Sequence, residues 1–124
     1  MYEVNRSIAL IRPNAPFLAW LKSLPGGLDA GLRLEDLAAD CNALLIPPVD
    51  DADSAADFVL HHYQTLFQAE LADWCEDETL WPAPLTAERF SEWFSVEIHS
   101  VLTDLVDAPL EREAFVPLDL NAED

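Results

Sequence analysis

The chain has 124 residues, 51% of them hydrophobic, and a formal net charge of -18 at pH 7. The charge is unevenly spread, because residues 1–33 hold four basic and two acidic side chains, whereas residues 34–124 hold two basic and 22 acidic ones. A field of this sign repels nucleic acids and anionic membranes and attracts basic partners. The composition therefore argues against a nucleic-acid-binding protein and against a membrane-surface protein.

The apolar and aromatic content is sufficient for a folded core, which disordered acidic chains lack. The length predicts a single domain over residues 1–114, with a C-terminal tail over residues 115–124. Two cysteines, Cys41 and Cys75, are too few for a disulfide framework. No apolar run is long enough to span a membrane, and the first residues lack the pattern of a signal peptide. We therefore expect a cytoplasmic location.

The first third of the chain predicts a strand followed by a helix. Residues 2–12 alternate in polarity and then become continuously apolar, which is typical of a strand, and Arg12-Pro13 ends the run. Asn14 is a candidate helix cap with Pro16 in the first turn, and Pro25 with two glycines ends this helix.

Two short elements and one long helix follow. Residues 34–40 predict a helical turn, and residues 42–46 form an apolar run that is typical of a buried strand. Acidic residues from Asp50 onward precede a helix over about residues 53–75, because carboxylates stabilise the positive end of a helix dipole. Apolar side chains recur along this segment at helical spacing, so we expect one face to pack against the core.

The last third of the chain predicts a helix, followed by a segment whose periodicity fits two kinds of element. Thr86 can cap a helix that extends to Trp93. Residues 94–105 fit either a continuing helix or a strand, and we favour a strand, because the run is rich in β-branched residues and two strands alone make a marginal sheet. The order of elements predicts an α+β domain in which helices pack on one face of a small three-stranded, mainly antiparallel sheet.

Two patterns suggest metal binding, and neither is complete. His61 and His62 are adjacent on the predicted helix, so their side chains point about 100° apart and cannot both hold one ion. Asp51, Asp53 and Asp57 match part of a calcium-binding loop, but the glycine and the final glutamate of that loop are missing. We expect neither a metal site nor another cofactor.

Glu97 and His99 form the one candidate pair for acid–base chemistry. They share a face of the predicted last strand, where a carboxylate could orient an imidazole. No Gly-x-Ser-x-Gly nucleophile turn and no phosphate-binding loop accompanies them. We therefore assign no catalytic residue, and a hydrolase or metal-dependent enzyme that uses this pair remains an alternative.

The clearest candidate binding surface combines tryptophans with acidic residues. Aromatic anchors surrounded by charged side chains are typical of protein interfaces. The predicted surface comprises Trp74, Asp77, Glu78, Trp81, Glu88 and Glu92. The alternative is that the tryptophans belong to the core and the acids only solvate it.

Three stretches of the sequence carry a resemblance to a known family. They are Met1-Tyr2-Glu3-Val4-Asn5-Arg6, then Trp74-Cys75 with Asp77 and Trp81-Pro82, then Trp93-Phe94-Ser95-Val96-Glu97-Ile98-His99-Ser100. In these stretches the chain resembles a family of small acidic bacterial proteins with no assigned activity. The resemblance implies a bacterial, cytosolic origin and supplies no site residues.

These observations favour an acidic protein-binding module that recognises a basic protein partner, as an adaptor, an inhibitor or an immunity-like protein would. A second reading is nucleic-acid mimicry, in which carboxylates take the place of phosphates in the groove of a DNA-binding partner. An exposed edge strand would also allow a homodimer.

Overall fold

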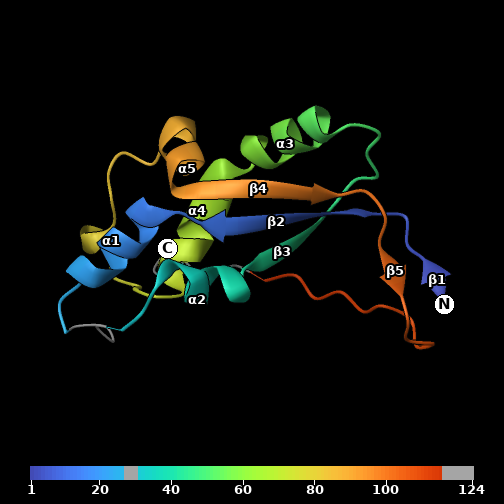
Figure 1. Cartoon of the computed structure of the whole chain (residues 1–124), viewed down its shortest axis with the longest axis horizontal. Coiled ribbons are helices and arrows are strands. Elements are labelled where there is room, and N and C mark those ends of the chain that lie inside the picture. The colour runs from blue at the N-terminus through green and yellow to red at the C-terminus, as the bar shows by residue number, and fades with distance from the viewer. Residues whose placement is uncertain (27–30, 116–124) are drawn as a thin grey trace.

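The computed structural model describes residues 1–26 and 31–115 (Figure 1). Its elements, in chain order, are β1 (Tyr2–Glu3), β2 (Ser7–Pro13), α1 (Ala15–Ser23), α2 (Leu34–Ala39), β3 (Asn42–Ile46), α3 (Ala52–His61), α4 (Tyr63–Ala72), the 3-10 helix η1 (Glu78–Leu80), α5 (Ala87–Trp93), β4 (Phe94–His99) and β5 (Thr103–Asp104). Three strands form an antiparallel sheet in the order β3-β2-β4, and β1 pairs with β5 in a second, two-stranded sheet. The predicted α+β fold with a three-stranded antiparallel sheet is confirmed.

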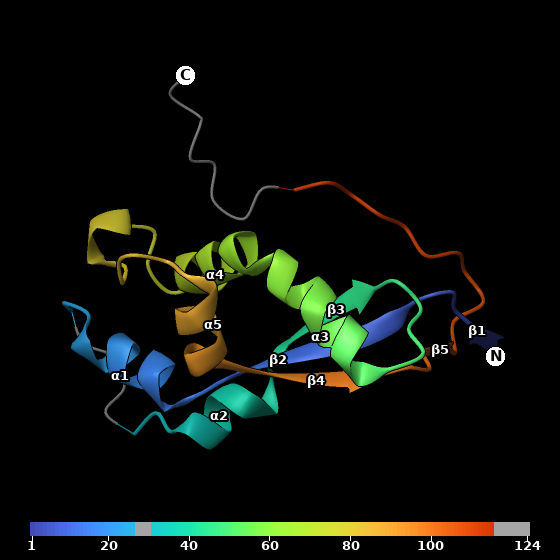
Figure 2. The ribbon, with the colours of Figure 1, turned by 90° about the horizontal axis from the view of Figure 1, so that it is seen from above.

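The central strand β2 has one buried side and one partly open side. Ser7, Ala9, Ile11 and Pro13 are buried, and the residues between them are only half-buried. In register with this strand, Leu44 of β3 and Ile98 of β4 flank Ala9 on its buried side. Figure 2 shows α3, α4 and α5 over one side of the sheet, with α2 on the other side near the end of β2. Burial therefore alternates along β2 as the pleat of a strand requires, although the sequence from Ile8 to Ile11 is continuously apolar.

Aromatic rings join the helices to the sheet. Phe67 of α4 lies with its ring centroid 5.8 Å from that of Phe90 of α5 and 5.6 Å from that of Phe94 of β4. Phe17 of α1 lies 5.2 Å from Phe94 in the same measure. All four rings are almost fully buried, so they form the centre of the core and hold α4 firmly against the sheet.

The predicted cap residue Asn14 has a different role from the expected one. It is the residue before α1, but its side chain makes no capping hydrogen bond. Its Nδ2 donates to the carbonyl oxygen of Glu92 at 3.2 Å, and its Oδ1 accepts from Ser95 Oγ at 2.9 Å. The side chain therefore ties the start of α1 to the junction of α5 and β4.

The prediction of one continuous helix over residues 53–75 is wrong, because the segment is divided at His62 into α3 and α4. The backbone N–H of His62 donates to Val59 at 2.9 Å instead of to Phe58. The carbonyl oxygen of Phe58 instead faces Nδ1 of the His62 ring, at 3.0 Å. A side chain that contacts a carbonyl in place of the backbone N–H interrupts the helical ladder, and the chain changes direction there.

The two long strands expected from the sequence are also shorter than predicted. The strand over residues 94–105 ends at His99, and the strand over residues 2–12 is divided into β1 and β2. Ser7 Oγ, which is buried, donates to the carbonyl oxygen of Ser100 at 3.1 Å and accepts from the backbone N–H of Val49 at 3.2 Å. The chain bends after Ser100 and returns to pair β5 with β1. Most of the predicted tail, residues 116–124, lies outside the described residues.

Candidate functional site

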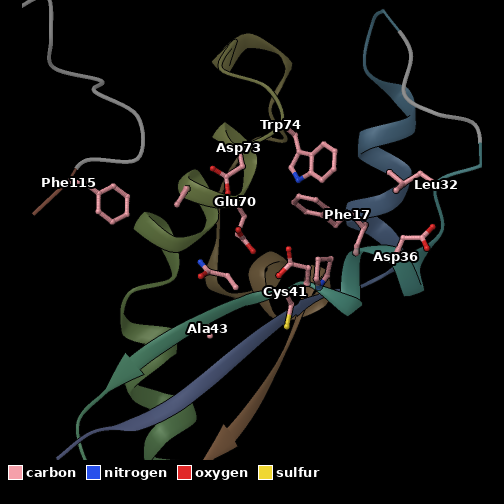
Figure 3. A pocket seen from close by; sticks show the side chains of 14 residues that line it. Phe17, Leu32, Asp36, Cys41, Ala43, Glu70, Asp73, Trp74 and Phe115 are labelled. Atoms are coloured by element: carbon pink, nitrogen blue, oxygen red, sulfur yellow. The ribbon is translucent and has the colours of Figure 1, made fainter. Parts of the chain in front are cut away.

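A cleft with a volume of about 830 Å³ opens between α1, α2, the start of β3 and the end of α4 (Figure 3). It is bounded by apolar and aromatic side chains on one part of its surface and by carboxylates on another. Its lining comprises Pro13, Phe17, Leu32, Asp36, Leu37, Asp40, Cys41, Asn42, Ala43, Ala69, Glu70, Asp73, Trp74 and Phe115. Concave sites that combine apolar walls with a few charged groups are the usual form of binding sites in proteins.

The charge of the cleft is uniformly negative. Asp36 and Asp40 come from α2 and the residue after it, whereas Glu70 and Asp73 come from the last turn of α4 and its C-terminal cap. No lysine, arginine or histidine is among the described lining residues. Within residues 1–26 and 31–115 no three acidic, histidine or cysteine side chains are placed to hold a metal ion together. The carboxylates are therefore spread too widely for one ion, and they suit an extended cationic group better.

Glu70 is the most perturbed of these carboxylates. Burial, and to a smaller extent the nearby negative charge of Asp73, together raise its pKa from 4.5 to about 7. The position follows from α4, which buries Phe67 and Leu71 and so holds the intervening Glu70 close to the core. A cation that entered the cleft would favour the charged form of this carboxyl, because an opposite charge lowers a carboxyl pKa.

Trp74 supplies an exposed aromatic surface beside these carboxylates. It follows the end of α4, where its backbone N–H donates to Leu71 at 3.1 Å, and 44% of its surface is exposed. Figure 3 shows its indole above Phe17 in this view, with Asp73 on one side of it and Leu32 on the other. The face of a tryptophan attracts cations, arginine in particular. The cleft thus combines a ring and carboxylates that favour the same type of ligand.

The other members of the predicted binding surface lie outside the lining of the cleft. Trp81 is half-buried, packs against the core and donates from Nε1 to the carbonyl oxygen of Cys75 at 2.7 Å. Asp77 accepts from Thr79 Oγ1 at 2.6 Å and from its backbone N–H at 3.0 Å, and these hydrogen bonds lower its pKa. Glu78, Glu88 and Glu92 are exposed on η1 and α5.

Sequence reasoning did not assign Asp36, Asp40 and Glu70, which the fold brings together with Trp74. One of them carried a usable signal. Glu70 lies three residues after Phe67 and four after Leu66, so it interrupts an apolar helix face. The two aspartates carried no such signal, because acids are common throughout this half of the chain.

The Glu97–His99 pair forms, but on the open face of the sheet. His99 Nε2 lies 2.5 Å from Glu97 Oε2, and Arg12 Nη2 lies 3.4 Å from Glu97 Oε1. The hydrogen bond with His99 and then that with Arg12 lower the pKa of Glu97. Both side chains of the pair are about half exposed, at 46% and 53%, and neither belongs to the cleft. The arrangement is a solvent-exposed cluster in which Glu97 forms an ion pair with Arg12 and a hydrogen bond with His99.

The remaining sequence candidates have local partners. Nδ1 of His61 lies 3.1 Å from the carbonyl oxygen of Asp57, one helical turn earlier, and His62 contacts Phe58 in the same way. Asp51 caps α3, where it accepts from the backbone N–H of Ser54 at 2.8 Å. Cys41 and Cys75 are both free thiols. No helix in the described part of the chain has the length and apolar character needed to cross a bilayer.

No protein-family model matches the sequence, and no curated protein or solved structure shows a significant match to the chain. The resemblance of the sequence to a family of small acidic bacterial proteins therefore stays a prediction.

Proposed function

We propose that this protein is an acidic protein-binding module that captures a basic partner through the cleft between α2 and α4. The observation that carries the proposal is the set of four carboxylates, Asp36, Asp40, Glu70 and Asp73, in a cleft whose described lining contains no basic side chain. Trp74 adds an aromatic surface to which a guanidinium group can bind.

The unpaired state of the acids supports this function. In the described residues, only Glu35 and Glu97 form ion pairs with basic side chains. A carboxyl with the burial of Glu70 is usually paired in proteins, because burial without a counter-ion is costly. A cationic side chain from a partner would supply the missing counter-ion, and the overall charge of -18 would accelerate its approach.

Binding of hexaarginine to the full-length protein tests the proposal. The measurement is isothermal titration at pH 8, where Glu70 is charged, with the double variant Glu70→Gln/Asp73→Asn compared with the wild type. We expect the variant to bind about tenfold more weakly, which corresponds to roughly 1.4 kcal/mol.

The matched control is Glu88→Gln/Glu92→Gln, which removes the same number of carboxylates from the exposed side of α5. We expect this control to lower the affinity less than about twofold, as surface charges outside a binding site do. Equal losses in the two double variants would mean that hexaarginine responds only to net charge, and the proposed cleft would be wrong.

A further inference from the structure

Strand β3 is a free edge of the central sheet. It pairs with β2 on one side, and in the described part of the chain its backbone groups make no hydrogen bond on the other side. Its residues are also poorly covered, since Asn42, Ala43 and Leu45 are exposed. An exposed edge with unpaired N–H and C=O groups is a template for a further strand.

The acidic cleft borders this free edge. Asn42 and Ala43 of β3 line one side of the cleft, and Ala69, Glu70 and Asp73 lie on the side of α4. Figure 3 shows β3 passing beneath the carboxylates of α4, with the cleft between the strand and the helix. A groove between an edge strand and a helix accommodates an extended peptide, which pairs with the strand and directs alternate side chains toward the helix.

The charges on the two sides of this groove define the chemistry of its occupant. Residues 42–46 carry no charge, so strand pairing there meets no repulsion. The helix side carries Glu70 and Asp73, and Asp40 lies at the start of the strand. A second copy of this chain would bring an uncharged strand and a further -18 of charge, and it would leave these carboxylates unpaired. A basic extended segment complements both sides.

We propose that the partner binds as an added β-strand: an extended basic segment pairs through its backbone with the free edge of β3 and places alternate cationic side chains among the carboxylates of the cleft. This inference rests on the proposed function and specifies the conformation of the bound segment. Affinity then comes from backbone hydrogen bonds as well as from charge.

A capped octapeptide in which arginine and valine alternate, together with two N-methylated derivatives that are isomers of each other, tests this mode of binding. One isomer is N-methylated on every arginine and the other on every valine, so each has one of its two strand edges blocked while all side chains are retained. We expect one isomer to bind the full-length protein about tenfold more weakly than the parent peptide, because its pairing edge is lost. The other isomer, whose free edge faces β3, is the matched control.

Amide hydrogen exchange gives a second readout on the same complex. We expect the parent peptide to slow exchange at the outward-facing amides within residues 42–46. Equal binding of all three peptides, with hexaarginine also bound, would overturn strand addition and leave the proposed function intact. Amides in this segment that are already protected in the free protein would also overturn it, because a second copy or the chain's own C-terminal segment would then occupy the edge. Failure of hexaarginine and of the parent peptide alike would remove the proposed function itself.

Discussion

The cleft and the open face of the sheet use the same kind of acidic side chain in opposite ways. On the open face, Glu97 contacts both His99 and Arg12, and these contacts lower its pKa. In the cleft, Glu70 has no basic neighbour among the described lining residues, and burial together with the charge of Asp73 raises its pKa to about 7. A carboxylate that already has its counter-ion has little to gain from a cationic ligand, whereas one held near the core without a counter-ion has much to gain. The comparison indicates that the cleft, and not the more conspicuous Glu97–His99 pair, is the site to test.

The largest expected effect is on the pH dependence of stability, which tests the contrast between Glu70 and Glu97. Because the folded pKa of Glu70 is raised from 4.5 to about 7, the folded state holds this proton more tightly than the unfolded state. The protonated Glu70 therefore contributes fully to the free energy of unfolding below pH 4.5. This contribution, about 3 kcal/mol, is lost as the pH rises through 7. We expect the difference in unfolding free energy between pH 5 and pH 8, measured with urea, to shrink in Glu70→Gln.

Glu88→Gln, on the exposed side of α5, is the control for the general loss of charge. We expect this variant to keep the pH dependence of the wild type. If both variants show the same pH profile, then Glu70 is ionised as an exposed carboxyl would be, and the contrast with Glu97 disappears.

Removal of the Trp74 ring tests the cleft through a smaller change in binding affinity. Trp74→Ala should weaken hexaarginine binding about threefold, since an exposed cation–π contact contributes roughly 0.5–1 kcal/mol. Phe58→Ala removes a comparably exposed ring from α3, outside the cleft lining, and should leave the affinity unchanged. Fluorescence titration at constant ionic strength measures both, and a similar loss in the two variants would argue against a role for the indole.

Salt should stabilise the protein, because most acidic side chains in the described part of the chain lack a basic partner and repel one another. We expect the melting temperature to rise as sodium chloride is increased to about 0.15 M. At this concentration the Debye length is roughly 8 Å, so repulsion between charges farther apart than this is largely screened. A constant or falling melting temperature over this range would show that self-repulsion is not a significant cost of folding.

The smallest effect belongs to the open face. Glu97 has a lowered pKa, so its pairing stabilises the folded state above the ordinary glutamate range and is lost as pH falls through the folded value. We expect Glu97→Gln to lower the melting temperature slightly at pH 7, and at pH 8 to act opposite in sign to Glu70→Gln. A stabilising effect of Glu97→Gln would mean that the contacts with His99 and Arg12 do not persist in solution.

Much of the fold could be predicted because local signals and tertiary packing agreed there. The apolar run that ends at Arg12-Pro13 marked the central strand, and the acids before α3 marked a helix start at which Asp51 does act as the cap. The strand interpretation of residues 94–99 was also right. The division at His62 could not be predicted, since both neighbouring segments follow helical spacing and the contact between the His62 ring and the carbonyl of Phe58 is visible only in the structure.

The candidate site was less predictable than the fold. The sequence predicts a surface that combines Trp74 with acids close to it in the chain, from Asp77 to Glu92. The structure instead places Asp36, more than thirty residues earlier in the chain, in the same cleft. The sequence does not indicate that Asp36 and Trp74 share a cleft, because acids are abundant throughout residues 34–124 and no single carboxylate differs from the rest until its surroundings are known.

The sequence alone determined the amount and sign of the charge, its concentration after residue 33, and the apolar run that forms the central strand. These are additive or local properties, so they can be counted from the chain. The tertiary structure decided that β3 is a free edge, that Glu70 loses solvent while Glu97 gains partners, and that carboxylates from α2 and α4 share one cleft. Those outcomes depend on packing between segments far apart in sequence, which local patterns do not specify.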